Sequence, residues 1–259
     1  MPKIGDTAHW RDENGEHSAV TRPALPIDKT YRYRHKNPLW CALSWVLHRP
    51  VMTPVAFLYT KIRYRHKIVN RRLLRAAYGQ GCFLYGNHTP ADADPFIPNL
   101  IALPKRTYVV VSAENLSNPR TRTFLELNGA IPVPTSLHAH RNFREILEKR
   151  TVQNCAVAIW PEADIRPCYT GIRPFSEVSF AYPVRFGEPV YCFTNTFHPR
   201  KHARLPRVVT YVDGPFYPDP HLPRREQASA LRDQVYATMC ERAKLSTYTP
   251  EKEVTHETV

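Results

Sequence analysis

The sequence predicts an α/β protein with a mixed, largely parallel sheet covered by helices, preceded by an N-terminal helical hairpin. Two observations lead to this prediction. From Gly79 onward, short apolar runs of strand length alternate with segments of helical periodicity, which is typical of strands joined by helical crossovers. In front of this region, an apolar stretch is enclosed by two concentrations of positive charge. With 259 residues, 42% of them hydrophobic, the chain can fill a substantial core.

Composition divides the chain into four segments. Residues 1–28 and 246–259 are polar, so we expect a loosely ordered N-terminus and a flexible C-terminal tail. Residues 29–78 are basic and contain the predicted hairpin and a linker helix, and residues 79–245 form the predicted α/β domain. The six cysteines are scattered without a C-x-x-C pair, which is typical of free thiols in a reducing compartment.

Positive charge is concentrated in the basic segment. The formal net charge of the chain is +13, and between Lys29 and Arg75 there are twelve Lys or Arg residues and no Asp or Glu. Charge of this density is typical of proteins that face a polyanion, either nucleic acid or an anionic membrane. The Tyr–Arg alternation could stack on bases. Nucleic acid is nevertheless not expected as a partner, because the apolar insert would then have no role.

The apolar insert is too interrupted to cross a bilayer as one helix. The pentapeptide RYRHK occurs at 32–36 and again at 63–67, on either side of apolar residues 38–60. A spanning helix needs about 20 apolar residues. A central charge costs at least ~2.5 kcal/mol, and proline removes helical hydrogen bonds. The interrupting residues are His48, Arg49, Pro50 and Pro54.

We therefore expect a membrane-associated helical hairpin that lies in one leaflet. Positive charge at both ends favours the cytoplasmic side for both, and the basic residues 61–78 are suited to anionic headgroups. The expected partner is an anionic membrane surface, and the expected location is the cytoplasmic face of the cell membrane, peripheral or monotopic. The alternative is a soluble helical subdomain with a solvated basic face. Aromatic residues suited to the interface are Trp40, Trp45, Phe57 and Tyr59.

Six strands and three helices are predicted for the α/β domain. The helix at 224–243 is amphipathic, with its apolar residues on one stripe. The other helices are predicted at 118–127 and 139–149. Apolar runs predict strands at 82–86, 107–112, 130–133, 156–160, 189–197 and 207–216.

A histidine and two aspartates follow the first of these strands, in the stretch YGNHTPADADPF. Functional groups of such folds collect beyond the carboxyl ends of strands, where His88 and Glu162 are expected. A neutral imidazole oriented by a carboxylate can remove a proton from a hydroxyl, and no serine or cysteine nucleophile is needed if the substrate brings that hydroxyl. Two alternatives are a divalent cation bound by His88, Asp92 and Asp94, and an ordinary polar turn.

Several common motifs are absent from the sequence. There is no G-x-S-x-G and no Walker A sequence, and GQGCFL has Leu84 where the dinucleotide pattern has its third glycine. No paired cysteine–histidine zinc spacing occurs either. No cofactor and no metal is expected.

The stretch around His88 resembles the N-H-x4-D signature of the glycerolipid acyltransferases, the family that includes 1-acylglycerol-3-phosphate acyltransferases. Three further stretches resemble blocks of that family and occur in its order. They are LNGAIPVP at 127–134, AIWPEADIRP at 158–167, and GIRPFSEVSFAYPV at 171–184. The basic N-terminal segment is similar to the family's membrane-docking element, so the resemblance covers roughly residues 38–215.

The resemblance implies an acyltransferase that uses acyl-CoA or acyl carrier protein as co-substrate. His88 would be the general base that removes the proton from a lysolipid hydroxyl, which then attacks the acyl thioester. An aspartate would orient His88, and Glu162 would place the polar head of the acceptor. Asn87, by its position, and the backbone N–H groups after His88 would lie near the developing oxyanion.

The sequence departs from the family pattern at three places. Asp94 is one residue too far from His88 and Asp92 one residue too close. We favour Asp94 because Asp-Pro-Phe follows it as in the family, and keep Asp92 as the runner-up. Pro134 and Thr135 stand near the place of the arginine of the second block.

The third block has Ala163 and Asp164 in place of Gly and Thr. Arg166 takes the arginine position there, and Arg173 adds a second charge for an acceptor phosphate.

The expected activity is acyl transfer to 1-acylglycerol-3-phosphate, which gives phosphatidic acid. Two alternatives remain open. Because the second-block arginine is missing, the acceptor could lack a phosphate. The chain could also be a non-catalytic protein that binds anionic lipid, although such a protein would need neither the His–Asp turn nor the Pro-Glu block.

Overall fold

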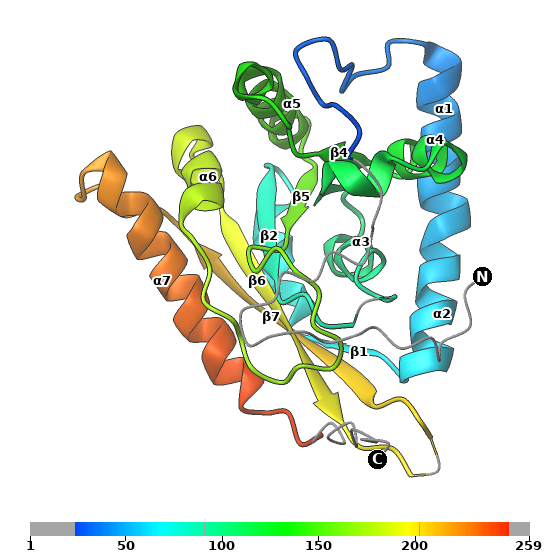
Figure 1. Ribbon diagram of the computed structural model, residues 1–259. Helices are drawn as coiled ribbons and strands as arrows, with labels where there is room; N and C mark the ends of the chain where they lie inside the picture. The colour runs from blue at the N-terminus through cyan, green and yellow to red at the C-terminus, as the bar shows by residue number, and fades with distance from the viewer. Residues whose placement is uncertain (1–23, 91, 202, 249–259) are drawn as a thin grey trace, which may run out of the picture.

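The structure, a computed structural model, describes residues 24–90, 92–201 and 203–248. Its centre is a seven-stranded sheet in the order β1-β7-β6-β2-β5-β3-β4 (Figure 1). All neighbouring strands are parallel except β6 and β7. The mixed, largely parallel sheet is therefore confirmed. The strands are β1 (Lys67–Val69), β2 (Cys82–Gly86), β3 (Thr107–Val111), β4 (Ala130–Pro132), β5 (Ala156–Ile159), β6 (Val190–His198) and β7 (Arg207–Phe216).

Six of these strands lie where the apolar runs predict them, and β1 is new. Its three residues lie inside the expected linker helix, and they pair in parallel with β7 at the edge of the sheet. So short a strand carries no periodic signal, and a partner some 140 positions away in the sequence holds it in place. Between the end of α2 and the start of β2, the expected linker helix is replaced by β1 and one 3₁₀ segment, η2 (Arg71–Ala77).

Helices cover both faces of the sheet. The three predicted helices are present as α4 (Pro119–Leu127), α5 (His140–Val152) and α7 (Arg224–Ala243). Two short helices that the sequence analysis does not predict are α3 (Ile97–Ala102) and α6 (Ala181–Phe186). Short 3₁₀ turns complete the connections: η3 (Ala113–Leu116), η4 (Leu137–Ala139) and η5 (Val178–Phe180).

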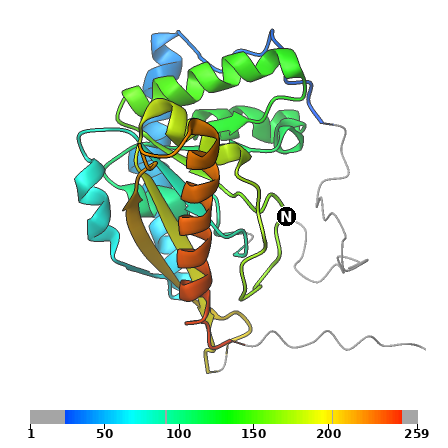
Figure 2. The ribbon, with the colours of Figure 1, turned by 90° about the vertical axis from the view of Figure 1, so that its left-hand side faces the viewer.

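Side chains of β2 alternate between two cores. Phe83 and Tyr85 pack in the core beneath α5, α6 and α7, whereas Cys82 and Leu84 pack on the opposite face. This alternation is the period of two that a strand imposes. Figure 2 shows α7 lying along one face of the sheet. The opposite core includes residues of α2, η2 and α3, so the N-terminal helix packs directly on the α/β domain.

Residues 38–64 form one continuous helix, so the expected helical hairpin is wrong. The helix consists of α1 (Pro38–Val46), a π-helical turn η1 (Leu47–Met52) and α2 (Thr53–Tyr64), and Figure 1 shows it as a single rod. Pro50 lies inside the π-helical turn, and Pro54 lies in the first turn of α2. The wide turn accommodates the Pro50 ring. Because both prolines lie inside the continuous helix, each of them leaves out the N–H of one helical hydrogen bond.

The π-helical turn keeps the buried side of this rod in line. Ser44 and Ala56 are both buried, yet twelve positions at about 100° each would place them about 120° apart around a regular α-helix. One residue absorbed by the wide turn reduces this offset to about 20°. His48 is 4% exposed and lies beside Arg106, and Ser44 Oγ donates to the Leu127 carbonyl at 2.5 Å.

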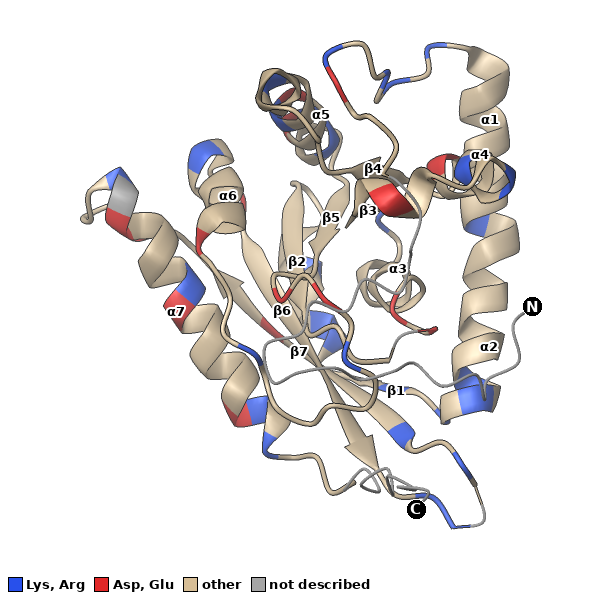
Figure 3. Cartoon of the chain, in the orientation of Figure 1, with Lys and Arg blue, Asp and Glu red and all other residues tan. Residues whose placement is uncertain are grey.

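The opposite side of the rod is apolar and exposed. Figure 3 shows few charged residues along the rod apart from the basic end of α2. Exposed fractions reach 78% at Leu39 and 59% at Phe57. None of the described helices has both the length and the hydropathy required to cross a membrane. The exposed apolar residues of the rod, called the apolar row below, are Leu39, Leu43, Trp45, Val46, Val51, Val55, Phe57, Leu58 and Ile62.

The described parts of both expected loose ends are packed. Ile27 is fully buried, and its backbone N–H donates to Thr135 Oγ1 at 2.9 Å. Thr247 N–H donates to the Phe197 carbonyl at 2.9 Å. Ile27 and Thr247 thus make defined contacts with the domain, and the remaining positions 1–23 and 249–259 of the two expected loose ends lie outside the described residues.

Candidate active site

The site begins where β2 ends. A Cβ at Gly86 would lie 2.1 Å from Cζ of Phe193, so only glycine lets the strand pass this ring. The next residues turn out of the sheet, and Asp94 N–H donates to the Pro90 carbonyl at 2.9 Å. This turn brings Asp94 back toward His88.

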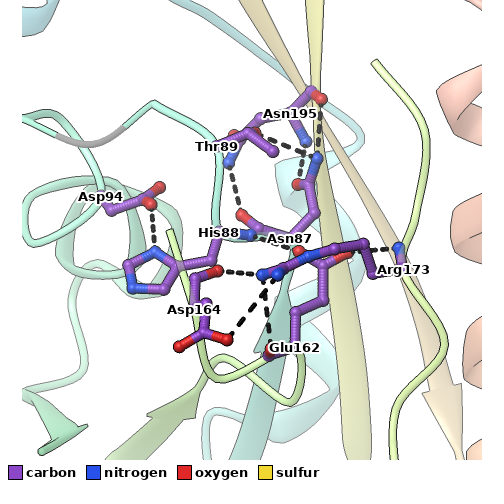
Figure 4. A network of polar contacts seen from close by, with 8 residues as sticks. All are labelled: Asn87, His88, Thr89, Asp94, Glu162, Asp164, Arg173 and Asn195. Carbon is purple, nitrogen blue, oxygen red and sulfur yellow. Dashed lines mark hydrogen bonds and ion pairs between the residues drawn. The ribbon is translucent and has the colours of Figure 1, made fainter. Parts of the chain in front are cut away.

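His88 and Asp94 form the closest ionisable pair of the site. His88 Nδ1 lies 2.5 Å from Asp94 Oδ2 (Figure 4). Asp94 is 1% exposed, and burial raises the pKa of its carboxyl to about 6, although the hydrogen bond from His88 acts in the opposite direction. An Nδ1–H that donates to Asp94 leaves the lone pair on Nε2. Within residues 24–90, 92–201 and 203–248, Nε2 makes no hydrogen bond.

Asp92 points away from His88 and toward α2. Its Oδ2 accepts from Tyr59 Oη at 2.7 Å and from Arg63 Nε at 2.7 Å, and its Oδ1 accepts from Tyr64 Oη. Burial acts to raise the pKa of Asp92, but these hydrogen bonds outweigh it and the pKa lies below its ordinary value. Of the two aspartates, Asp94 therefore pairs with His88.

Glu162 holds the backbone of the turn that carries His88. It is 7% exposed, and its Oε2 accepts from His88 N–H at 3.0 Å while Oε1 accepts from Arg173 N–H at 2.9 Å. Burial raises the pKa of Glu162, and these two backbone hydrogen bonds oppose the rise. Both carboxylate oxygens are thus engaged within the protein.

The loop after β5 adds two further backbone hydrogen bonds to the same turn. Arg166 N–H donates to the His88 carbonyl at 2.9 Å, and Cys168 N–H donates to the Thr89 carbonyl at 3.0 Å. The Arg166 side chain is exposed, with its guanidinium 4.4 Å from the ring centre of Tyr169. The backbone of Arg166 therefore stabilises the turn, whereas its charged side chain lies at the surface.

Arg173 is partly buried beside Glu162. Its Nη2 donates to the carbonyls of Glu162 (3.3 Å) and Asp164, and its Nη1 lies 3.9 Å from Asp164 Oδ2. Figure 4 shows the guanidinium crossing the loop between these residues. A quarter of the side chain remains exposed. Arg173 is thus the cation nearest to the Glu162 carboxylate among the residues predicted for the site.

Asn87 faces away from the reaction centre and pairs with Asn195 of β6. Asn87 Oδ1 accepts from Asn195 N–H at 2.8 Å, and Nδ2 donates to the Asn195 carbonyl at 3.1 Å and to Thr89 Oγ1 at 3.2 Å. Asn87 is 1% exposed, and both N–H bonds of its side-chain amide are already used. The expectation that Asn87 donates to an oxyanion is therefore not met by this geometry. Asn87 therefore fastens the turn that carries His88 to β6.

Two residues of the site are missed by the sequence analysis. Asn195 is a polar residue inside a buried strand, and this position in the sequence could have identified it as a candidate site residue. Trp160 ends an apolar run, and its ring stacks on His88 with 5.2 Å between centres and 27° between planes. The indole Nε1 of Trp160 is buried and has no hydrogen-bond partner among the described residues.

The arrangement does not resemble a metal centre. Among the described residues, no three His, Cys, Asp or Glu side chains are grouped so that they could hold a metal ion. His88, Asp92 and Asp94 do not converge, because Asp92 is turned toward α2.

Comparison with known proteins identifies a solved structure with a similar fold. No family model matches the chain, and no curated protein sequence matches it. A solved structure is similar: the crystal structure of PlsC, the 1-acyl-sn-glycerophosphate (LPA) acyltransferase from Thermotoga maritima, with a TM-score of 0.56 and 13% identity. The match covers 84% of this chain and 100% of that one. At this identity the likeness shows that the two chains share a fold.

Proposed function

We propose that this chain is an acyltransferase that moves a fatty acyl group from acyl-CoA or acyl carrier protein to the hydroxyl of a lysophospholipid. The observation that carries the proposal is the His88–Asp94 pair, with Nδ1 2.5 Å from the carboxylate and Nε2 without a partner in the described chain. It stands at the carboxyl end of β2, where such folds bind their ligands. The fold shared with an acyltransferase supports the reaction class.

The pair supports a mechanism with one proton carrier. Nε2 of His88 takes the proton of the acceptor hydroxyl while that oxygen forms a bond to the thioester carbonyl carbon. The tetrahedral intermediate then expels the thiolate, which takes the proton from the imidazolium, and an ester and a free thiol result. Asp94 stabilises the imidazolium between these steps, and a base of this kind contributes ~10²–10⁴-fold to the rate.

The neighbouring residues act on this pair and on the acceptor. Glu162 and Asn87 fix the backbone of the turn through hydrogen bonds of 3.0 and 2.8 Å. Arg166 and Arg173 supply positive charge for the acceptor's phosphate. The proposed acceptor is 1-acylglycerol-3-phosphate, which gives phosphatidic acid. An acceptor without phosphate is the alternative, because Pro134 and Thr135 stand where the related family has an arginine.

We also propose that the chain docks on the cytoplasmic face of a membrane through the apolar row. Its residues are 43–78% exposed, and contiguous apolar surface of this kind marks a partner or a membrane. Lys61 at the end of the same helix and Arg65 just after it are exposed, so they can meet anionic headgroups. A continuous helix lying in the interface requires no hairpin.

The direct experiment offers the chain a panel of acceptors. The protein, in liposomes, is incubated with radiolabelled acyl-CoA or acyl carrier protein and a series of lysolipids with and without phosphate, and the labelled product is identified. The proposal requires one acylated lysolipid and an equal amount of free thiol. Tight liposome binding without product for any donor would instead identify a non-catalytic protein that binds anionic lipid.

A further inference from the structure

A second concave site lies beside the edge strand β4, whereas His88 follows the central strand β2. It is a pocket of about 810 Å³ between the extended residues 31–37 and α5. Figure 1 shows these two elements facing each other above β4, and Figure 3 shows basic residues on both. The function proposed above uses none of the side chains that line it.

Three aromatic residues fix the extended segment in place. Tyr31 Oη donates to Glu126 Oε1 at 2.8 Å, and Tyr33 Oη donates to the Pro132 carbonyl at 3.0 Å. The His35 ring stacks on Trp40 with 4.1 Å between centres. Because side chains alternate along an extended chain, anchoring 31, 33 and 35 turns 32, 34 and 36 to the open side. The duplicated basic motif therefore presents Arg32, Arg34 and Lys36, all exposed, on a held backbone.

The pocket has an excess of positive charge that the protein does not neutralise. Arg32, Arg34, Lys36 and Lys149 line it, and within the described chain none of the four has an ion-pair partner. Its one acidic lining residue, Glu145, is engaged by Arg141 at 2.9 Å. Burial and the charges of Arg34, Arg150 and Lys36 lower the pKa of Lys149. Cations held together in this way favour an anion between them.

We propose that this pocket binds a phosphate-ester group. Its volume falls in the range of small-molecule sites, about 300–1,000 Å³, and its cations suit several phosphate oxygens. The inference rests on the proposed function for the source of the phosphate. One source is the 3′-phosphoadenosine diphosphate of an acyl-CoA donor, and the other is the headgroup of an anionic phospholipid.

The position of the pocket suits either source. Three strand spacings separate β4 from β2, or about 14 Å, so a ligand held here needs a long arm to reach His88, and the CoA molecule has one. The pocket also borders the start of α1, where Leu39 begins the apolar row. A phospholipid headgroup in the pocket would then lie level with the proposed membrane surface.

The test measures binding without turnover. The full chain is titrated with CoA and with dephospho-CoA, and its partition onto phosphatidylcholine vesicles is measured with and without phosphatidylglycerol. The test variant combines Arg34→Gln, Lys36→Gln and Lys149→Gln. A control variant removes the same charge from exposed residues elsewhere, as Arg185→Gln, Lys201→Gln and Arg204→Gln. Circular dichroism checks that both variants fold.

We expect the test variant to lose at least tenfold in affinity in one arm while the control stays within twofold of wild type. Loss for CoA, together with weaker binding of dephospho-CoA by wild type, identifies the donor as the source. Loss confined to phosphatidylglycerol vesicles identifies the headgroup. If the test and control variants bind CoA and phosphatidylglycerol vesicles equally well, the proposal that this pocket binds a phosphate-ester group is overturned. A chain that binds but never transfers an acyl group refutes the proposed function alone.

Discussion

Arg63 Nε lies 2.7 Å from Asp92 Oδ2, so helix α2 holds the loop that carries Asp94 two residues later. Tyr59 and Tyr64 of the same helix donate to the same carboxylate. The helix that exposes the apolar row is thus tied directly to the turn that positions the proposed base. Asp92 joins these two parts of the molecule.

The first prediction concerns this tie. Asp92→Ala should lower kcat roughly tenfold, because the freed loop lets Asp94 shift from His88, and 1.4 kcal/mol of lost positioning corresponds to a factor of ten. The KM for both substrates should change little. Asp233→Ala, which removes an exposed aspartate paired with Arg232, is the matched control and should retain full kcat. Equal kcat values for Asp92→Ala and Asp233→Ala would contradict the claim that the contacts between Asp92 and α2 position Asp94.

The second prediction concerns the pH dependence of the rate. Burial raises the pKa of Asp94 to about 6, so its carboxylate is lost as the pH falls below 6 and can no longer stabilise the imidazolium. The kcat/KM of the wild type should therefore decline on this acid side. Asp94→Asn should lower kcat/KM roughly 10²-fold or more above pH 6, where the wild type carries the Asp94 carboxylate.

The same variant also tests how Asp94 affects the free energy of unfolding at different pH values. The folded pKa of Asp94 lies above its unfolded value of 3.8, so the stability it contributes is present below pH 3.8 and is lost as the pH rises through 6. At pH 7 the buried carboxylate therefore lowers the free energy of unfolding. Asp94→Asn should unfold in urea at pH 7 no earlier than wild type, and a large loss of stability would contradict this account.

The third prediction concerns the apolar row. Leu43→Ser combined with Phe57→Ser should weaken partition onto anionic vesicles at least tenfold, because burying each side chain contributes ~1.5–3 kcal/mol. The control is Val152→Ser with Val178→Ser, two residues that are 74% and 70% exposed elsewhere on the surface. Equal losses for the two pairs, measured by vesicle sedimentation, would exclude the row as the docking surface.

The fourth prediction concerns acid stability. Burial lowers the pKa of His66 to about 4, and its Nε2 lies 2.7 Å from Thr210 Oγ1. The unfolded chain takes up the proton at pH 6.5, so the stability contributed by the neutral ring is present above 6.5 and is lost as the pH falls toward 4. At pH 5 the loss is about 2 kcal/mol. In urea unfolding, His66→Gln should shrink the difference between pH 7 and pH 5.

The sequence is sufficient to predict features whose cause is local. The run 82–86 is apolar at every position and is buried on both faces, so it is recognisable as a strand without its neighbours. His88 and its aspartate are also close in the sequence, although only the resemblance to the acyltransferase pattern favours Asp94 over Asp92.

Features that depend on distant residues escape prediction. Pro50 predicts a helix break, but the chain continues through it in a π-helical turn in which His48 is buried. The Asn87–Asn195 pair depends on the register between β2 and β6, which places Gly86 beside Phe193. The first arrangement has no signal in the neighbouring residues of the sequence, and the second has only a polar residue, Asn195, within an apolar run.

The central claim is that His88 is the base of an acyl transfer, and its most direct test is thiol release. Wild type and His88→Gln, each reconstituted in the same vesicles, are mixed with acyl-CoA and the lysolipid that the panel identifies, and free CoA is measured against time. We predict release by wild type only when the lysolipid is present, and at least 10²-fold less by His88→Gln with unchanged vesicle binding. Release by the variant at the wild-type rate would contradict the claim.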